Sequence, residues 1–133
     1  MNFAKYTDVA LLLLRLTFGG LMIYGHGWRK MLRLFSGESI EFADPFGLGP
    51  AASLVLAVLA EVLCSIFVML GLFTRWALIP LIITMGVAFL VVHISDPFAR
   101  MEKAILYLIP YIALFLSGPG AYSLDALLFK NHK

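Results

Sequence analysis

The sequence predicts an all-α integral membrane protein, a bundle of four transmembrane helices followed by a short C-terminal interfacial helix. Apolar residues make up 62% of the 133-residue chain and the mean hydropathy is +0.95, whereas soluble domains contain roughly 45–50% apolar residues. The apolar residues gather into stretches of about 20, the length needed to cross a hydrocarbon core about 30 Å thick. We therefore expect residues 1–133 to form a single membrane domain in contact with the lipid bilayer.

Short polar connections separate the predicted spans, which cover residues 9–31, 50–72, 76–94 and 97–117. The connection between the second and third spans is so short that these two must form an antiparallel hairpin. Before the fourth span, Asp96 is expected to cap the helix and Pro97 to occupy its first position. Because Arg15 interrupts the first apolar run, we expect that run to be a retained span rather than a cleaved signal peptide.

Two segments lie outside these spans. Residues 36–49 are rich in glycine and acidic residues, which is typical of a loop, so this longest connection is the expected lid or docking surface. After a Gly-Pro-Gly breaker, residues 122–130 are expected to form a short amphipathic helix along the headgroups, with Tyr122 as an anchor.

The charge and cysteine content exclude several functions. A formal net charge of +2 with scattered basic residues argues against nucleic-acid binding. The single cysteine, Cys64, excludes an intrachain disulfide framework, a CxxC redox pair and a thiolate metal cage built from this chain alone. Redox chemistry would therefore require a bound cofactor, Cys64 itself or a partner protein.

Positive charges do not decide the orientation in the membrane. The side of the termini would carry Lys5, Arg75, Lys130 and Lys133, and the other side a similar number. Because residues 36–49 are acidic and the ends of small four-helix proteins often stay inside, we expect both termini to be cytoplasmic. The predicted location is a bacterial-type inner (cytoplasmic) membrane, crossed several times.

Ionisable residues inside the spans are the candidate functional residues, because each costs on the order of a few kcal/mol in hydrocarbon and needs a partner. The set comprises Arg15, His26, Glu61, His93 and Glu102. Depth along the helices brings Arg15 within reach of Glu61, so this pair is expected to neutralise both charges. We expect the remaining candidates to border one cavity that opens towards the long loop, as ligand-binding or proton-exchange groups: His26, Glu61, His93 and Glu102.

Each of these residues also has a structural explanation. The pair of Arg15 and Glu61 would serve equally well to fix helix packing. His26 and His93 would serve as interfacial hydrogen-bond donors, and haem or a metal on them is the weaker alternative, so no metal site is predicted. Cys64 is expected to be a small core residue.

Several short motifs, in their order and spacing, resemble the DoxX family of small four-helix membrane proteins. They are Leu14-Arg15-Leu16, Gly25-His26-Gly27-Trp28-Arg29-Lys30, Ala60-Glu61, Leu70-Gly71-Leu72-Phe73-Thr74-Arg75, Met85-Gly86-Val87-Ala88, His93, Glu102 before Leu106-Tyr107-Leu108, and Gly118-Pro119-Gly120-Ala121-Tyr122-Ser123-Leu124-Asp125. The resemblance implies a relation to the membrane subunit of a thiosulfate:quinone oxidoreductase, and a link to thiol, quinone or oxidative-stress responses alongside soluble enzymes. It carries over no catalytic residue.

Two functions of different classes follow. In the first, the chain is the membrane component of a redox system that handles a quinone or a thiol or sulfur compound. A quinone would lie between the helices, hydrogen-bonded to His26 or His93, with Glu61 or Glu102 exchanging the proton and a soluble oxidoreductase partner supplying electrons. In the second, the chain is a non-catalytic anchor, transport or scaffolding module with a structural polar cluster. The sequence leaves open whether the chain is an enzyme, which cofactor it holds and whether it forms a homo-oligomer.

Overall fold

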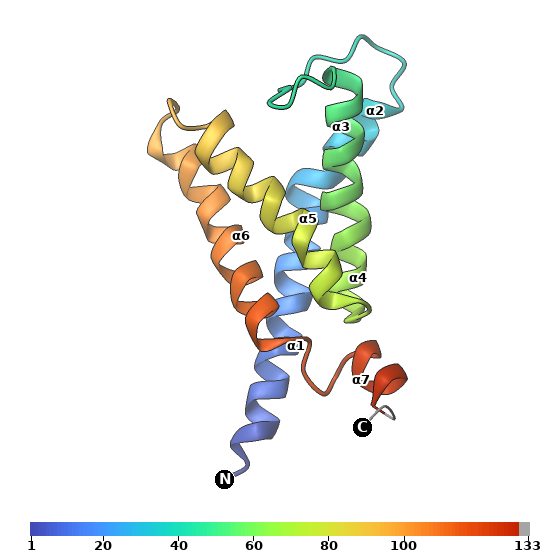
Figure 1. Cartoon of the computed structure of the whole chain (residues 1–133), viewed down its shortest axis with the longest axis vertical. Helices are drawn as coiled ribbons and strands as arrows, with labels where there is room; N and C mark the ends of the chain where they lie inside the picture. The colour runs from blue at the N-terminus through green and yellow to red at the C-terminus, as the bar shows by residue number, and fades with distance from the viewer. Residues whose placement is uncertain (131–133) are drawn as a thin grey trace.

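The computed structural model describes residues 1–130, which contain helices and no strand (Figure 1). Three π-helical turns, labelled η, interrupt the long helices. The elements are α1 (Phe3–Met22), η1 (Ile23–Gly27), α2 (Trp28–Leu34), α3 (Pro50–Val58), η2 (Leu59–Cys64), α4 (Ser65–Leu70), α5 (Thr74–Val87), η3 (Ala88–Val92), α6 (Phe98–Ser117) and α7 (Leu124–Phe129). Lys133, counted above for orientation, lies outside the described residues.

Three continuous helices among the described residues are long and apolar enough to cross a membrane. They are Phe3–Leu34, Pro50–Leu70 and Thr74–Val92, with mean hydropathies of 1.5, 2.6 and 2.1. They correspond to the first three predicted spans. The fourth predicted span forms helix α6, but Arg100, Glu102 and Lys103 all lie in its first two turns. A membrane crossing by α6 and an interfacial position for α7 therefore stay predictions.

The helix ends differ from the predicted boundaries for local reasons. The first helix begins at Phe3, because the side chain of Asn2 accepts a hydrogen bond from the Lys5 amide. The second long helix ends at Leu70, where Gly71 turns into the left-handed region with a φ of 67°.

The predicted cap of α6 is wrong. The helix begins at Phe98, and Pro97 occupies the cap position without a side-chain hydrogen bond. The Asp96 carboxylate makes no capping bond because it is engaged with His93 and Arg100.

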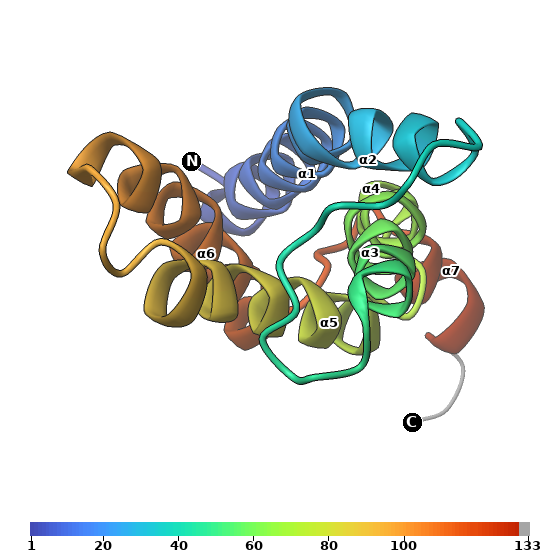
Figure 2. The same ribbon diagram turned by 90° about the horizontal axis from the view of Figure 1, so that it is seen from above.

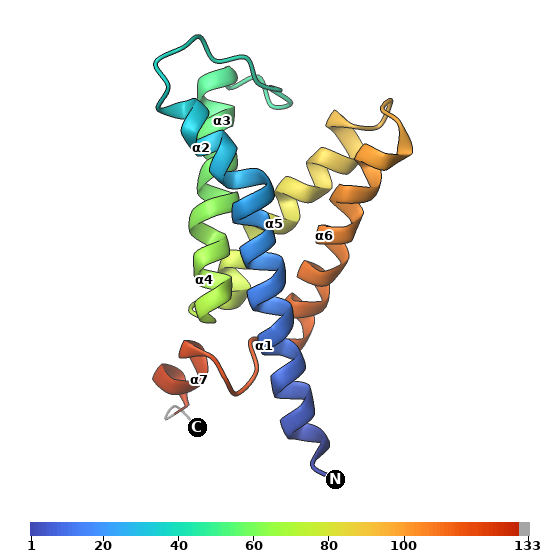
Figure 3. The same ribbon diagram turned by 180° about the vertical axis from the view of Figure 1, so that it is seen from behind.

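The long helices pack side by side and separate at one end. α5 packs along α6, and α1 packs along α4. The N-terminus of α1 and helix α7 lie at one end of the molecule and residues 36–49 at the other (Figures 1 and 3). At the loop end, α5 and α6 lean away from α2 and α3, and the loop passes across that end (Figure 2).

The core lies where all four long helices meet. Its buried side chains are Met22, Val68, Ala77, Leu78, Leu81, Met85, Tyr111 and Leu114. Tyr111 is fully buried, and its hydroxyl donates to the carbonyl oxygen of Phe18 over 3.1 Å. This bond satisfies the polar end of Tyr111 and joins α6 to α1.

A carboxylate fixes α7 to the turn between α4 and α5. Asp125 accepts hydrogen bonds from the amides of Phe73 (2.7 Å) and Thr74 (2.9 Å), and its own amide donates to the Gly71 carbonyl (2.8 Å). A carboxylate at a helix N-terminus satisfies free N–H groups and complements the helix dipole. The C-terminal segment is thus part of the folded bundle.

Candidate functional site

A buried ion pair between Lys30 and Glu61 lies near the open end of the bundle. The Lys30 Nζ atom is 2.6 Å from Glu61 Oε1 and 2.8 Å from Oε2. The Glu61 side chain is 1% exposed and that of Lys30 is 25% exposed. One ammonium group therefore satisfies both carboxylate oxygens of a glutamate that is removed from water.

The predicted ion pair between Arg15 and Glu61 is wrong. Arg15 is fully buried, but its guanidinium donates to main-chain carbonyl oxygens, those of Met69 (3.1 Å), Val68 (3.4 Å) and Tyr122. Arg15 therefore ties the end of α4 to the segment that precedes α7, at the opposite end of the bundle from the long loop.

The register between the first two long helices explains this error. A Cβ atom added to Gly27 would lie 3.1 Å from the Glu61 carbonyl oxygen, and one added to Gly19 would lie 3.1 Å from that of Ser65. In this antiparallel register Arg15 is about two turns from Glu61, on the order of 12 Å along the axis. The prediction compared the depths of Arg15 and Glu61, each counted from the midpoint of its own helix. Packing between the two helices sets their register, and such depths do not contain it.

A second polar pair follows η3. His93 Nδ1 lies 2.6 Å from Asp96 Oδ2, and the same oxygen is 3.6 Å from Arg100 Nη1. The hydrogen bond from His93 is the main reason why the pKa of Asp96 lies below its ordinary value, and the charge of Arg100 adds to it. Within residues 1–130, the Nε2 atom of His93 has no hydrogen-bond partner.

The π-helical turns coincide with the candidate residues. His26 lies in η1, Glu61 lies in η2, and His93 directly follows η3. A π-helical turn holds one more residue than an α-helical turn and changes the direction of the side chains around it, and such turns are frequent at functional sites.

A cavity of about 540 Å³ lies between the second and third long helices beneath the loop. Its apolar walls include Phe42, Pro45, Phe46, Leu56, Ala57, Ala60, Pro80, Ile83 and Val92. Its polar lining groups are Lys30, Ser53, Glu61, Thr84 and His93. This volume lies within the range of small-molecule sites, roughly 300–1,000 Å³, and the mixture of apolar walls with few polar groups is typical of them.

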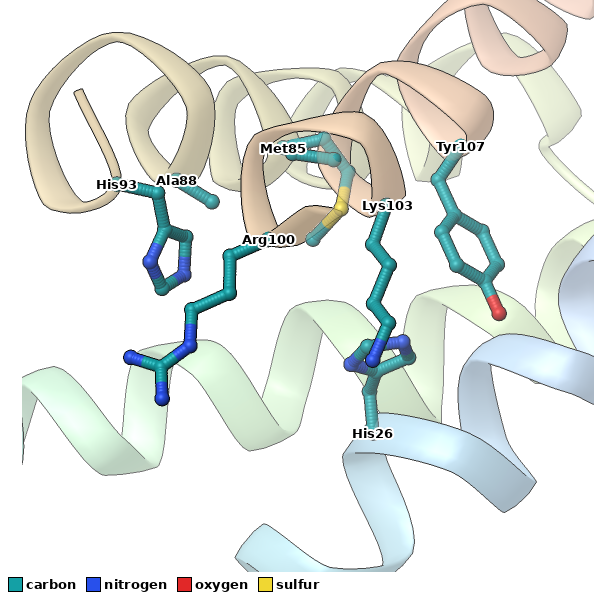
Figure 4. Close-up of a pocket in the computed structure, with 8 residues that line it drawn as sticks. His26, Met85, Ala88, His93, Arg100, Lys103 and Tyr107 are labelled. Carbon is teal, nitrogen blue, oxygen red and sulfur yellow. The ribbon is translucent and has the colours of Figure 1, made fainter. Parts of the chain in front are cut away.

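A smaller cavity of about 110 Å³ adjoins the large one, since both are bordered by Met85, Ala88 and His93. Its other lining residues are His26, Arg100, Lys103, Ala104 and Tyr107. Figure 4 shows Lys103 extending from α6 towards the helix that carries His26. The His26 ring packs edge-on against Tyr107, with centroids 5.2 Å apart and planes at 87°.

The structure therefore divides the predicted site. Glu61 and His93 line the large cavity, and His26 and His93 line the small one. Glu102 lines neither cavity and is exposed on α6. Glu102 is separated from the cavities because of the rotation of α6 about its own axis. The amino-acid composition of the first turns of α6 does not determine this rotation.

Sequence reasoning missed Arg100 and Lys103, which line the small cavity, and it identified Lys30 and Tyr107 only as positions of the family motifs. A signal for Lys30 was present, since it follows His26 by one helical turn and so shares its face. Arg100 and Lys103 are three residues apart on one helix and also share a face.

The loop is attached to α3 through Asp44. Its Oδ1 atom accepts from the Leu48 amide and the Ser53 hydroxyl, and Oδ2 accepts from the Gly49 amide, each over 2.9 Å. The hydrogen bond from Ser53 is the largest cause that lowers the pKa of Asp44 from its ordinary value. These bonds fix the part of the loop that covers the large cavity.

Among the described residues, no three His, Cys, Asp or Glu side chains come together in a way that would hold a metal ion. Cys64 is half-buried at the end of η2 and lines neither cavity.

The chain matches the sequence model of the DoxX family over residues 10–94. It is also similar to a protein of Haemophilus influenzae described as "Uncharacterized protein", with 32% identity over an alignment that covers 98% of each chain. No solved structure matches it. The family resemblance of the sequence motifs is thus confirmed, and the chain belongs to the DoxX family.

Proposed function

We propose that this chain is the quinone-binding membrane component of a redox system that works with a soluble oxidoreductase. The observation that carries the proposal is the large cavity, in which apolar walls surround the Lys30–Glu61 ion pair and the imidazole of His93. A quinone ring and the first part of its tail need such apolar walls and a few hydrogen-bond donors at the carbonyl oxygens.

The residues of the cavity fit a quinone in type and position. Lys30 and His93 provide hydrogen-bond donors on different helices, so each is available to a different carbonyl oxygen. Glu61 accepts both hydrogen bonds from the Lys30 ammonium within 2.8 Å, and its carboxylate is the proposed group that takes up or releases a proton in the cavity. His26, which borders the neighbouring cavity, is a positioning group for Tyr107 and not a ligand in this arrangement.

A quinone accepts two electrons and two protons when it is reduced. The electrons come from the soluble partner, which brings its own redox group. The exposed and acidic loop, with Glu38, Glu41 and Asp44, is the proposed contact for that partner and lies directly above the cavity.

The test is equilibrium binding of a short-tail benzoquinone to the purified chain in neutral detergent. Replacement of the ion pair by Lys30→Gln with Glu61→Gln removes both charges and leaves a polar side chain at each position. We expect this change to weaken binding by about tenfold, the effect of losing a hydrogen bond to a charged group.

The matched control is Arg33→Gln with Glu38→Gln, which removes the same two charges from exposed positions outside the cavity. This control should bind like the wild type. Equal binding by both double variants, or no saturable binding by the wild type, would contradict the proposal.

The second candidate function is a non-catalytic anchor, transport or scaffolding module. The observation that favours it is the mutual satisfaction of Lys30 and Glu61, which is what a purely structural pair requires. If the chain has this second function, the wild type does not bind quinone, and removal of the Lys30–Glu61 pair only lowers the stability of the fold.

The proposed location is a bacterial-type inner membrane with both termini in the cytoplasm. Support comes from the position of the N-terminus and α7 at one end of the bundle and the acidic loop at the other. A fluorescent reporter fused to the C-terminus should be active inside the cell, and an alkaline phosphatase fusion inactive. The mass of the purified protein in detergent would show whether the chain forms a homo-oligomer and how many copies of the chain it contains.

A further inference from the structure

The small cavity carries a charge pattern that the quinone proposal does not use. Four of its lining residues present nitrogen hydrogen-bond donors or cations: His26, His93, Arg100 and Lys103. His26 lies in η1, His93 follows η3, and Arg100 and Lys103 extend from α6 (Figure 4); all four border the same space. No carboxylate is among the lining residues.

The acidic groups within residues 1–130 pair with only part of this positive charge. Asp96 is bound to His93 and lies 3.6 Å from Arg100. Lys103 forms no ion pair within residues 1–130, and α6 has no acidic residue in its first turn. Cations at the start of a helix oppose its dipole, so this placement lowers the stability of α6 unless an anion is bound.

We propose that the small cavity binds a phosphate group, held by Arg100 and Lys103 from α6 and by His26 from the facing helix. The cavity volume of about 110 Å³ is well above the roughly 10–15 Å³ that one water requires, so it accepts a phosphorus atom with its oxygens. The planar guanidinium group of arginine can bind two phosphate oxygens at once, and the ammonium group of lysine adds a compact positive charge.

The location allows two sources of this phosphate group. His93 and Arg100 flank the connection after the Thr74–Val92 helix, where a helix that crosses the membrane would reach the lipid headgroups. A free inorganic phosphate would satisfy the same donors, and the experiment distinguishes the two.

The experiment follows the ring nitrogens of His26 and His93 by NMR in the purified full-length chain in neutral detergent. In one arm inorganic phosphate is added. In the other arm the chain is placed in bilayer discs of phosphatidylcholine with increasing phosphatidylglycerol. A saturable shift in the first arm identifies a free anion, and a saturable shift only with phosphatidylglycerol identifies a headgroup.

The variant that tests the site is Arg100→Gln with Lys103→Gln, and its control is Lys5→Gln with Lys130→Gln, which removes two positive charges at the other end of the molecule. We expect the first to bind the probe at least about tenfold more weakly than the wild type, and the control to bind it equally well. If the double variant does not fold, the affinity of Lys103→Gln alone is compared with those of the wild type and the control variant.

Three results would overturn the proposal. They are the absence of a saturable shift with either probe, a response to phosphatidylglycerol that equals the response to phosphatidylcholine when inorganic phosphate also gives no shift, and unchanged affinity in the folded variant. None of these results depends on quinone binding, because Arg100 and Lys103 do not line the large cavity.

Discussion

At the scale of single residues, Lys30 and Glu61 differ in how they would respond to the loss of their partner. Glu61 is 1% exposed, so removal of Lys30 leaves a charge with no access to water. Lys30 is 25% exposed and has a flexible stem, so its ammonium can turn to water when Glu61 is removed.

We therefore predict that Lys30→Met lowers the free energy of unfolding by about 3–5 kcal/mol, and that Glu61→Gln has a smaller effect. The measurement is denaturant unfolding in detergent, with the two changes combined in a double-mutant cycle. Equal costs for the two single variants would contradict the predicted difference between them, and no coupling in the cycle would show that the ion pair does not determine stability.

The attachment of the loop through Asp44 should depend on pH. The pKa of Asp44 is lowered from its ordinary value of 3.8, chiefly by the Ser53 hydroxyl, so the attachment is fully present above that value. It is lost as the pH falls through the lowered pKa. In Ser53→Ala the pKa should rise towards 3.8, and the loop should detach at a higher pH.

Carbon NMR of the aspartate carboxyl groups measures this titration. Ser36→Ala, in the same loop but without a bond to Asp44, is the matched control. An identical Asp44 titration in the wild type and in Ser53→Ala would refute the assignment of the shift to Ser53.

At the scale of helices, two neighbouring glycines should respond in opposite ways to alanine. A Cβ atom at Gly27 would meet Val62 Cγ2 at 2.7 Å and the Glu61 carbonyl oxygen at 3.1 Å, whereas one at Gly25 meets nothing within 4 Å. Gly27→Ala should force the first two long helices apart and lower stability by about 1–3 kcal/mol.

Gly25→Ala should instead be neutral or stabilising by about 0.5–1 kcal/mol, since alanine favours the helix and its methyl group has space. Thermal unfolding of both variants in the same detergent measures the difference. If Gly27→Ala were as stable as Gly25→Ala, the close approach that sets the helix register would be absent.

The turn between α4 and α5 depends on a residue far along the chain. Asp125 accepts the amide hydrogens of Phe73 and Thr74, and Phe73 has a φ of 46°, which is unfavourable for a residue with a side chain. We expect Asp125→Ala to cost about 0.5–2 kcal/mol, because it removes the acceptor of two amides at the start of α5.

Hydrogen exchange of the Phe73 and Thr74 amides gives a direct measurement, and both should exchange faster in this variant. Asp125→Asn keeps one acceptor oxygen and should have an intermediate effect. Unchanged exchange in Asp125→Ala would mean that α7 does not stabilise the turn.

At the scale of the whole molecule, the number of membrane crossings decides which ends share a side. We predict that α6 crosses the bilayer although its first two turns carry Arg100, Glu102 and Lys103, because charged side chains near a helix end can extend to the interface.

Single cysteines in a Cys64→Ser background test this topology with a membrane-impermeant reagent. Ser39→Cys and Ser95→Cys should react from one side of the membrane, and Lys5→Cys and Lys130→Cys from the other. Reaction of Lys130→Cys from the same side as Ser95→Cys would show that α6 does not cross.

The sequence by itself determined the helical class, three of the long apolar helices and the burial of Arg15 and Glu61. These follow from local properties: a helix in lipid must be apolar over about 20 residues, and an ion cannot face hydrocarbon without a large cost. The family motifs are also read directly from the order of residues.

Only the tertiary structure decided which polar groups meet. Glu61 pairs with Lys30 and not with Arg15 because packing near Gly27 sets the register of two antiparallel helices. Glu102 faces outward while Lys103, one position further along, borders a cavity, because the rotation of α6 depends on its contacts with α5. Register and rotation are relations between helices, and the hydrophobic pattern of one helix does not contain them.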